Sequence, residues 1–339
     1  MSVTALRKIG KDSVPAIGFG AMGISVAYGK VGTDEERFKV LDAAFEAGCT
    51  HWDTADVYGD SEDLIGKWFK RNGKRSSIFL ATKFGLSFAD GRIRARGDPE
   101  YIKQQFNNSL ERLGTDYIDL YYVHRVDPLT PIETSIQVMA DFVKDGKVKY
   151  LGMSECTAND LRRAHAVHPI TALEVEYSPF ALEIEDPKLA LLKTARELNI
   201  KIIAYSPLGR GLLTGEIKSP DDFEPDDARH TFTKFSKENF PKILSIVDRI
   251  QEIGKKHSAS AGQVVLSWIL AQGEDFFVIP GTKKEKYLLE NVGAAAVKLS
   301  QEEIDTIRKI AEEADQLPGD RFQPGWRDIA YTESPQLPE

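Results

Sequence analysis

Hydrophobic and polar positions follow two patterns that alternate along the chain, one helical and one extended. Stretches in which apolar residues recur three and four positions apart predict helices at 34–47, 61–71, 99–112, 132–145, 157–166, 187–198, 241–257, 262–272, 285–296 and 301–314. Short runs rich in β-branched and aromatic residues predict strands at 17–20, 50–53, 78–82, 117–123, 148–153, 172–176, 200–205 and 276–279. The sequence therefore predicts eight strands separated by helices.

The connections between these strands are too long for hairpins, which predicts a parallel sheet buried on both faces. No Pro/Ser-rich linker or shift in composition divides the chain, so we expect an α/β fold with a single domain over 1–339, a closed (β/α)₈ barrel. Residues 4–15 are expected to form a small hairpin that closes the bottom of the barrel. The long 206–240 segment and an extended tail, about 315–339, are expected to lie over the active site.

Composition indicates a soluble cytoplasmic protein. Hydrophobic residues make up 42% and charged residues 28%, and no apolar run approaches the ~18 residues of a membrane span. The first residues lack the pattern of a secretory signal, and Cys49 and Cys156 are expected to be small buried residues in a reducing compartment. The net charge of −8 argues against nucleic-acid binding. The basic run 92–96 is predicted to be a solvated loop that could attract an anionic substrate if it borders the site.

One glycine motif is misleading. Gly18 to Gly23 fits G-x-G-x-x-G, the fingerprint of a dinucleotide-binding Rossmann unit. That fingerprint requires a helix that opens inside the motif, whereas here 24–32 reads as an irregular loop and the helix begins near Thr33. We expect instead that the glycines let a loop pass close beneath a ligand.

Titratable residues follow three consecutive predicted strands. Asp53 ends the second strand and has Tyr58 in its loop, Lys83 follows the third strand, and His124 follows the fourth. Catalytic groups of such barrels gather at the carboxyl ends of strands. Taken singly, Lys83 could be solvated and His124 structural. Together they predict an acid: an adjacent ammonium would lower the pKa of the Tyr58 phenol, Asp53 would hold Lys83, and His124 would orient the substrate oxygen or relay its proton. No metal site is expected, because His124 is the only histidine at a strand end.

Several motifs in the same order resemble those of the aldo-keto reductase superfamily over nearly the whole chain. The resemblance implies a catalytic tetrad of Asp53, Tyr58, Lys83 and His124, and an enzyme that reduces aldehydes or ketones with hydride from NADPH. The motifs are Gly18-Phe19-Gly20, Asp53-Thr54-Ala55-x-x-Tyr58-Gly59, Ala81-Thr82-Lys83, Leu120-Tyr121-Tyr122-Val123-His124, Leu151-Gly152-Met153-Ser154, Glu176-Tyr177-Ser178, Ala204-Tyr205-Ser206-Pro207-Leu208-Gly209 and Ile279-Pro280-Gly281-Thr282 to Glu290-Asn291.

The cofactor positions can be argued in part from the residues themselves. The run 279–284 ends the eighth strand and opens a helix, where free N–H groups suit a phosphate, and Lys283 would favour the 2′-phosphate of NADPH. The alternative is a solvated lysine pair. The resemblance adds contacts to the nicotinamide, the pyrophosphate and the adenine. The expected cofactor-binding residues are Gly20, Ala21, Met22, Asp53, Ser154, Glu155, Glu174, Tyr205, Ser206, Pro207, Leu208, Gly209, Arg210, Leu213, Gly281, Thr282, Lys283, Glu290 and Asn291.

Two residues depart from the family pattern near the expected nicotinamide carboxamide. Glu155 stands where the family often has Asn, and Glu174 where it often has Gln. A carboxylate accepts hydrogen bonds from the carboxamide NH₂ but cannot donate to its oxygen. We therefore expect Glu174 to accept that bond and its negative charge to favour NADP⁺.

The expected substrate pocket is apolar and aromatic, which suits aromatic or extended aliphatic aldehydes. A rival interpretation is a redox-sensing regulatory subunit, because the β subunits of voltage-gated potassium channels share this barrel and bind NADPH. Neither interpretation fixes the oligomeric state, and a homo-oligomer is possible. The segments expected around the pocket are Tyr28, 84–96, 125–127, 206–240 and the tail with Phe322 and Trp326.

Overall fold

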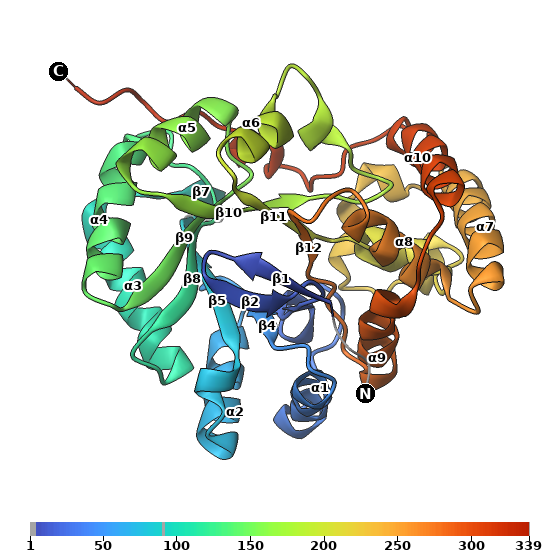
Figure 1. Cartoon of the computed structure of the whole chain (residues 1–339), viewed down its shortest axis with the longest axis horizontal. Coiled ribbons are helices and arrows are strands. Elements are labelled where there is room, and N and C mark those ends of the chain that lie inside the picture. The colour runs from blue at the N-terminus through green and yellow to red at the C-terminus, as the bar shows by residue number, and fades with distance from the viewer. Residues whose placement is uncertain (1–4, 90–91, 339) are drawn as a thin grey trace.

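The computed structural model describes residues 5–89 and 92–338. Its main sheet has eight parallel strands, each hydrogen-bonded to its neighbours in the order β12-β11-β10-β9-β8-β5-β4-β3. The strands are β3 (Phe19–Gly20), β4 (His51–Asp53), β5 (Phe79–Phe84), β8 (Ile118–Val123), β9 (Val148–Ser154), β10 (Ile170–Glu176), β11 (Lys201–Tyr205) and β12 (Phe276–Val278). In Figure 1 these strands curl around a common centre.

The segment before β3 closes this sheet against β12. Ile17 forms a parallel bridge with Val278, the Gly18 amide donates to the Val278 carbonyl at 2.8 Å, and the Val278 amide donates to the Ala16 carbonyl at 2.9 Å. The first and last strands are thus joined, which confirms the predicted barrel. The sheet leaves no place for a Rossmann unit, since a helix does not begin until Asp34.

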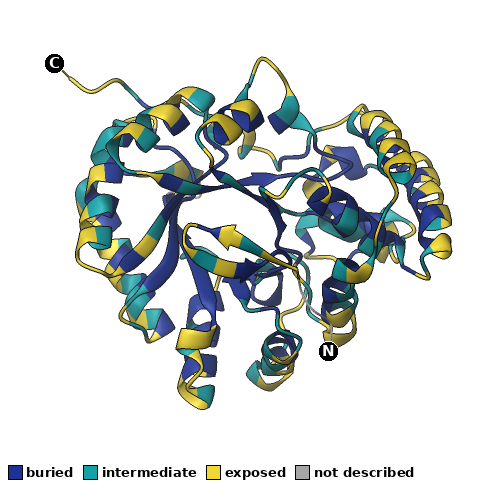
Figure 2. Ribbon diagram, viewed as in Figure 1, coloured by how far each residue is buried: buried dark blue, intermediate teal, exposed yellow. Residues whose placement is uncertain are grey.

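The helices surround the sheet, and their exposed faces point away from it (Figures 1 and 2). Local signals set their ends: Thr33 and Glu36 form a capping box before α1, and Gly73 ends α2 in the left-handed conformation. The helices are α1 (Asp34–Glu46), α2 (Ser61–Asn72), α3 (Pro99–Leu113), α4 (Ile132–Lys144), α5 (Ala158–Val167), α6 (Leu191–Glu197), α7 (Phe240–Lys256), α8 (Ala261–Leu270), α9 (Glu285–Gly293) and α10 (Gln301–Asp315). No helix in the described part of the chain is long and apolar enough to cross a bilayer.

The expected N-terminal hairpin is present. Strands β1 (Leu6–Ile9) and β2 (Asp12–Pro15) pair antiparallel, and the chain then enters β3. The turn packs on the barrel, because the Lys11 amide donates to the Tyr150 hydroxyl at 2.9 Å. In Figure 1 the hairpin lies across the centre of the strand ring, which confirms its predicted position.

Three segments differ from the sequence-based expectation. β5 continues to Phe84, so Lys83 lies within the strand. The basic run predicted as a loop forms β7 (Arg92–Ala95), which pairs antiparallel with β6 (Leu86–Ala89). The helix expected over 187–198 is reduced to α6, preceded by Ala190 at φ +49°.

The long 206–240 connection is built from short 3₁₀ turns. They are η4 (Gly209–Thr214), η5 (Pro220–Asp222), η6 (Ala228–Thr231) and η7 (Thr233–Phe235). Four phenylalanines in this segment are buried: Phe223, Phe232, Phe235 and Phe240. The segment is therefore a folded part of the domain with its own apolar contacts.

The C-terminal tail after α10 crosses the end of the barrel where the strands finish. The Tyr331 amide donates to the Glu155 carbonyl, just after β9, at 2.9 Å. Further along, the buried Ser334 hydroxyl donates to Asp160 of α5 at 2.6 Å and accepts from the Ile132 amide of α4 at 3.2 Å. The tail is thus fastened at two points.

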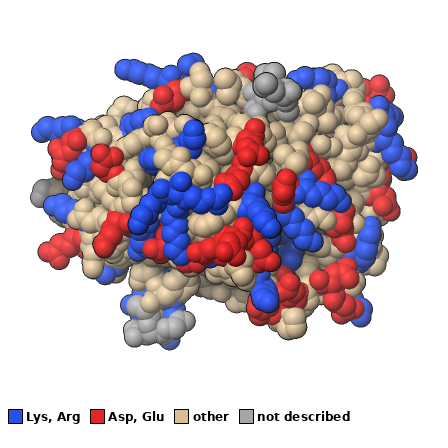
Figure 3. Space-filling view, turned by 90° about the horizontal axis from the view of Figure 1, so that it is seen from below, with Lys and Arg blue, Asp and Glu red and all other residues tan. Residues whose placement is uncertain are grey.

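Charged side chains of both signs are distributed over the surface. Figure 3 shows one face, on which Lys and Arg are interspersed with Asp and Glu. Within the part of this face that the structure describes, positive charge is not gathered into the broad patch that a nucleic-acid backbone requires.

Candidate active site

Four side chains expected to act together converge at the carboxyl ends of neighbouring strands. Asp53 is the last residue of β4, Lys83 lies near the end of β5, and His124 directly follows β8. Tyr58 lies in the loop between β4 and α2. Because β4 pairs with β5, and β5 with β8, these residues share one end of the barrel.

The contacts among these four residues form one buried cluster. The Lys83 ammonium donates to Asp53 Oδ1 and, at 2.9 Å, to the Thr54 carbonyl. The same ammonium lies 5.0 Å from the centroid of the Tyr58 ring. The Tyr58 hydroxyl is 3.5 Å from His124 Nε2, and the two rings meet edge to face. The structure therefore brings together all four residues that the sequence predicted to act as one cluster.

The electrostatics of the phenol differ from the sequence-based expectation. Burial raises the pKa of Tyr58 more than the charge of Lys83 lowers it. The sequence predicts that Lys83 lowers the pKa of Tyr58 below its usual value. Lys83 does act in that direction, but the overall shift of the pKa is upward, so the prediction is wrong. Tyr58 is protonated at neutral pH and holds a proton to donate.

The neighbouring groups have clear charge states. Burial lowers the pKa of His124 well below its usual value, with Arg125 and Lys83 acting in the same direction, so the imidazole is neutral. Burial by itself would lower the pKa of Lys83, but the negative charge of Asp53 raises it overall. A neutral imidazole and a fixed ammonium thus flank the protonated phenol.

Glu174 joins this cluster from β10. Its Oε1 lies 3.3 Å from the Lys83 Nζ, and its side chain is almost fully buried. Burial and the Asp53 charge raise the pKa of Glu174 well above its usual value. This raised pKa favours the protonated, neutral form of Glu174, whereas the sequence-based expectation gave it a negative charge. A neutral carboxylic acid can donate as well as accept, as Gln does.

Glu155 is turned away from the role that the resemblance implies. Its Oε1 accepts from the Glu176 amide at 2.9 Å, and its Oε2 accepts from Arg321 of the tail at 3.0 Å. Burial opposes ionisation, but Arg321 and Arg125 lower the pKa of Glu155 to about 2. Both oxygens of this carboxylate are engaged within the protein, so the structure does not present it to a carboxamide.

Arg321 is a residue of the site region that the sequence did not reveal. Besides Glu155, this buried guanidinium binds Glu176 at 2.9 Å and Glu183 at 2.8 Å. It is 166 positions from Glu155, and no motif links the two. Arg210, expected near the pyrophosphate, donates to the same Glu176 at 3.0 Å.

The glycines at the start of the barrel have a structural explanation. A Cβ on Gly20 would lie 2.6 Å from the Ile279 carbonyl oxygen, and one on Gly281 would lie 2.7 Å from the Gly20 carbonyl oxygen. These glycines let the first and last strands approach. Ala21 follows them and donates its amide to the Asp53 carbonyl at 2.8 Å, and Met22 begins the 3₁₀ turn η1 (Met22–Ile24). The expectation that the glycines serve a ligand is not needed to explain them.

The segment after β11 suits an anionic ligand. Ser206, Gly209, Arg210 and Gly211 have φ of +47°, +56°, +57° and +96°. The Gly209 and Gly211 amides are bonded within the loop, to the Ser206 carbonyl at 2.9 Å and the Leu208 carbonyl at 3.0 Å, so these tight turns serve mainly to place Arg210. The buried Arg210 Nε has no hydrogen-bond partner, and Tyr205 is half-buried at the end of the strand. This donor set fits the pyrophosphate and nicotinamide of a dinucleotide.

The second expected phosphate region precedes α9. Lys284 caps this helix without a side-chain hydrogen bond, and Thr282 accepts from the Lys284 amide at 3.1 Å. The Lys283 ammonium donates to the carbonyls of Tyr28 and Lys30, so it contacts the loop after η1. Two further expected residues lie in α9: Glu290 accepts from the hydroxyl of Ser260, the residue before α8, at 2.5 Å, and Asn291 is buried.

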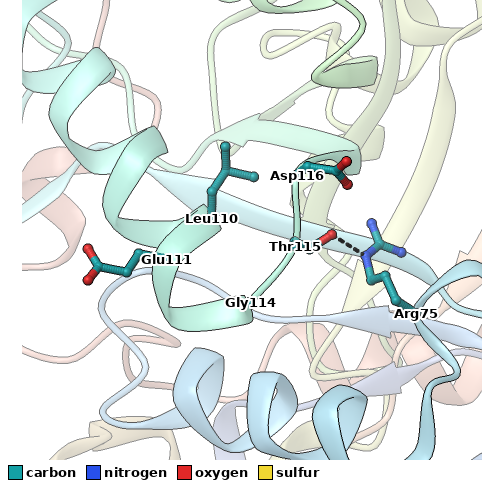
Figure 4. A pocket seen from close by; sticks show the side chains of 6 residues that line it. All are labelled: Arg75, Leu110, Glu111, Gly114, Thr115 and Asp116. Atoms are coloured by element: carbon teal, nitrogen blue, oxygen red, sulfur yellow. Dashed lines mark hydrogen bonds between the residues drawn. The ribbon is translucent and has the colours of Figure 1, made fainter.

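A surface pocket elsewhere has no comparable chemistry. Figure 4 shows its lining, Arg75, Leu110, Glu111, Gly114, Thr115 and Asp116, which lies between α3 and β8. This is the end of the barrel where the strands begin, opposite to Tyr58. Its arginine is already bonded to Thr115 at 3.0 Å and to Asp119 at 2.9 Å. The cluster around Tyr58 is therefore the candidate active site.

Comparisons with curated proteins agree with this geometry. The chain is 63% identical over 338 residues to aldo-keto reductase str7 of Strobilurus tenacellus, which covers 98% of both proteins. It is 48% identical over 337 residues to the aldo-keto reductase yakc (NADP⁺) of Schizosaccharomyces pombe, again over 98% of both.

Solved structures and a family model point the same way. The glycerol dehydrogenase AKR11B4 from Gluconobacter oxydans superposes with a TM-score of 0.82 at 27% identity, covering 94% of this chain and 98% of that one. The family model described as Aldo/keto reductase family matches residues 16–312. The chain therefore belongs to the aldo/keto reductase family, whose members carry out the oxidoreduction of carbonyl compounds.

Proposed function

We propose that this protein reduces an aldehyde or ketone to the alcohol with NADPH, and that Tyr58 is the general acid. The observation that carries the proposal is the protonated Tyr58 hydroxyl, 3.5 Å from His124 and beside the Lys83 ammonium. When bound, NADPH supplies the hydride that adds to the carbonyl carbon. The name of the S. pombe relative, which includes NADP⁺, supports this choice of cofactor.

The protein's own groups then have distinct roles. Tyr58 gives its proton to the carbonyl oxygen, and the Lys83 ammonium stabilises the phenolate that remains. Asp53 keeps Lys83 charged and aimed through their buried ion pair. His124, neutral and next to the phenol, orients the substrate oxygen by hydrogen bonding.

Residues from three segments would hold NADPH. Arg210, placed by the left-handed turns from Ser206 to Gly211, would bind the pyrophosphate, and Tyr205 would contact the nicotinamide. Lys283 would bind the 2′-phosphate, which requires its ammonium to leave the carbonyls of the 28–30 loop. Glu174, as a neutral acid, would exchange two hydrogen bonds with the carboxamide.

A panel of aldehydes and ketones, followed at the nicotinamide absorbance band, tests the function. In Tyr58→Phe we expect turnover to fall by about 10²- to 10⁴-fold, because that is the usual contribution of a general acid. NADPH affinity, measured by fluorescence titration, should stay within a few-fold. Tyr150→Phe is the matched control, since it removes a hydroxyl at the opposite end of the barrel.

Two outcomes would contradict the proposal. Turnover of Tyr58→Phe near the wild-type rate would remove Tyr58 from its role. A wild-type protein that binds NADPH yet reduces no carbonyl compound in the panel would favour the regulatory-subunit alternative.

A further inference from the structure

Arg125 places an unpaired positive charge beside the catalytic residues. It follows His124 directly and is only 4% exposed. Its Nη1 donates to the His124 carbonyl at 2.6 Å and to the Ser154 hydroxyl at 3.2 Å. Its Nε is buried and has no hydrogen-bond partner. Arg125 forms no ion pair with any carboxylate in 5–89 or 92–338.

The carboxylates around Arg125 are already committed to other partners. Glu155, whose pKa Arg125 lowers, has both oxygens bonded to Arg321 and to the Glu176 amide. Asp127, two residues after Arg125, accepts from the amides of 97 and 129 and from the hydroxyl of residue 130. Glu155 is near enough for its charge to interact with that of Arg125, but neither carboxylate accepts a hydrogen bond from Arg125, so its remaining N–H donors are left free among the described residues.

The other arginines of this region show the contrast. Arg321 is about as deeply buried as Arg125 and Arg210 is partly buried, and both bind Glu176. A guanidinium taken out of water without a counterion costs several kcal/mol. A folded protein retains such a charge where a ligand supplies the counterion, and the planar fork of arginine matches a carboxylate.

Arg125 is close enough to the reacting centre for that ligand to be the substrate. It donates to the His124 carbonyl at 2.6 Å, and the His124 ring lies 3.5 Å from the Tyr58 hydroxyl. A group bound to its free donors would therefore belong to the same molecule whose carbonyl meets Tyr58.

The rim of the barrel above Arg125 carries further positive charge. The β6–β7 hairpin follows β5, and its return strand is tied to this region, because the Arg96 amide donates to the Gly85 carbonyl at 2.9 Å and the Gly97 amide donates to Asp127 at 2.8 Å. Arg94 on this hairpin is exposed and makes no ion pair with a described carboxylate. In a protein of net charge −8, this local cluster would guide anions to the site.

We propose that Arg125 binds a carboxylate of the carbonyl substrate, so that the preferred substrates are aldehydes or ketones that also carry an acid group. This inference rests on the proposed reductase function. The carboxylate is not changed by the reaction: the carbonyl carbon gains hydride, its oxygen gains the Tyr58 proton, and the acid group only binds.

The test compares each acid with its own methyl ester, which keeps the carbonyl and removes the charge. Suitable pairs are 2-, 3- and 4-carboxybenzaldehyde and succinic semialdehyde with their methyl esters. For at least one acid, we expect the wild-type kcat/KM to exceed that of its ester by about tenfold or more. A hydrogen bond to a charged group contributes about this much, and the difference should lie mainly in KM. Arg125→Met should lower kcat/KM for the acid at least ten times more than for the ester, and Arg125→Lys should keep part of the preference.

A second measurement does not depend on turnover. Benzoate should raise the melting temperature of the wild-type NADP⁺ complex and inhibit carbonyl reduction competitively, and Arg125→Met should lose both effects. Arg249→Met, an exposed arginine of α7 paired with Glu313, is the control and should retain them.

Three results would overturn the inference or separate it from the proposed function. If no acid is preferred over its ester in the wild type, Arg125 does not select carboxylates. If Arg125→Met lowers kcat/KM equally for acid and ester, Arg125 acts through Ser154 or the fold. If no carbonyl compound is reduced at all, the proposed function fails. In that case benzoate binding still tests Arg125, and its absence would overturn the proposed carboxylate site.

Discussion

At the scale of single residues, the decisive feature is a phenol that stays protonated despite a neighbouring ammonium. Burial raises the pKa of Tyr58 more than Lys83 lowers it. Lys83 therefore contributes when the proton leaves, because the phenolate that forms is paired with a charge already in place. Pre-organised charge of this kind needs no rearrangement during the reaction.

This charge arrangement predicts the pH profile of reduction. The acid must be protonated to act, its pKa is raised, and His124 is neutral over the same range. We expect kcat for carbonyl reduction to be flat from about pH 6 to about pH 9 and to fall only above the ordinary tyrosine value near 10. Stopped-flow measurement of the first turnover checks this. A decline with an apparent pKa between about 6 and 8 would show that another group donates the proton.

Glu174 gives a second prediction at this scale. As a neutral acid it resembles Gln in charge and shape, so Glu174→Gln should change the ratio of NADP⁺ to NADPH affinity by less than about twofold. An ionised Glu174 would attract the cationic oxidised ring by several kcal/mol at close range, and its loss would lower the NADP⁺ preference tenfold or more. Titration of both cofactors distinguishes these cases. Glu183→Gln, at a partly exposed carboxylate of the tail contact, is the control.

At the scale of elements, the sequence predicts most of what local chemistry determines. The strand ends that carry Asp53 and His124 lie where the pattern placed them, because β-rich runs between amphipathic helices leave few alternatives. The β6–β7 hairpin was missed although Arg92 to Arg96 alternates charged and apolar residues, the period of a strand. Its dense positive charge masks this strand period.

Other misses depend on contacts that no local pattern contains. The start of α6 is displaced because Asp186 accepts a hydrogen bond from the Lys188 amide at 2.8 Å, which competes with helix formation. The sign of the Tyr58 pKa shift depends on burial, and burial depends on how distant segments pack. The Arg321 contacts join the tail to β9 and β10 across 166 and 145 positions.

The tail contact can be tested as an element. Arg321→Met would leave Glu155 buried beside only Arg125 and lower the free energy of unfolding by about 3 kcal/mol or more, because breaking one side of a buried pair strands a charge. Adding Glu155→Gln should restore part of this loss. Urea unfolding at pH 7, with limited proteolysis of the tail, measures both. If the double variant were less stable than Arg321→Met alone, the ion pair would not be the source of the effect.

The same pair predicts a pH dependence with a definite sign. The folded-state pKa of Glu155 is lowered to about 2, so its ionisation stabilises the fold above the unfolded value near 4.3. That stability is lost as pH falls from about 4 through about 2. The difference in unfolding free energy between wild type and Arg321→Met should therefore shrink over this range.

At the scale of the whole molecule, the site depends on closure of the strand ring. The tetrad spans β4, β5 and β8, Glu174 comes from β10, and the residues expected to hold the cofactor follow β11 and β12. The catalytic residues and the cofactor segments keep their positions relative to one another only if the strands form a continuous ring. The seam between β3 and β12 is where continuity depends on small residues, since Gly20 contacts the Ile279 carbonyl and Gly281 contacts the Gly20 carbonyl.

Gly20→Ala tests this dependence. The added Cβ would lie 2.6 Å from the Ile279 carbonyl oxygen, which is backbone and cannot rotate away, so the seam must widen. We expect a loss of about 1–3 kcal/mol in unfolding free energy, typical of overpacking, and weaker NADPH binding, because β3 pairs with β4 at Asp53 and β12 leads into the 281–283 segment. Gly262→Ala, in α8 with ordinary contacts at 3.6 Å and beyond, should be neutral or slightly stabilising. Urea unfolding followed by circular dichroism, with NADPH titration of both variants, decides the matter. A stable Gly20→Ala with unchanged cofactor affinity would mean that the two ends of the sheet adjust independently, and that the ring does not hold the site together.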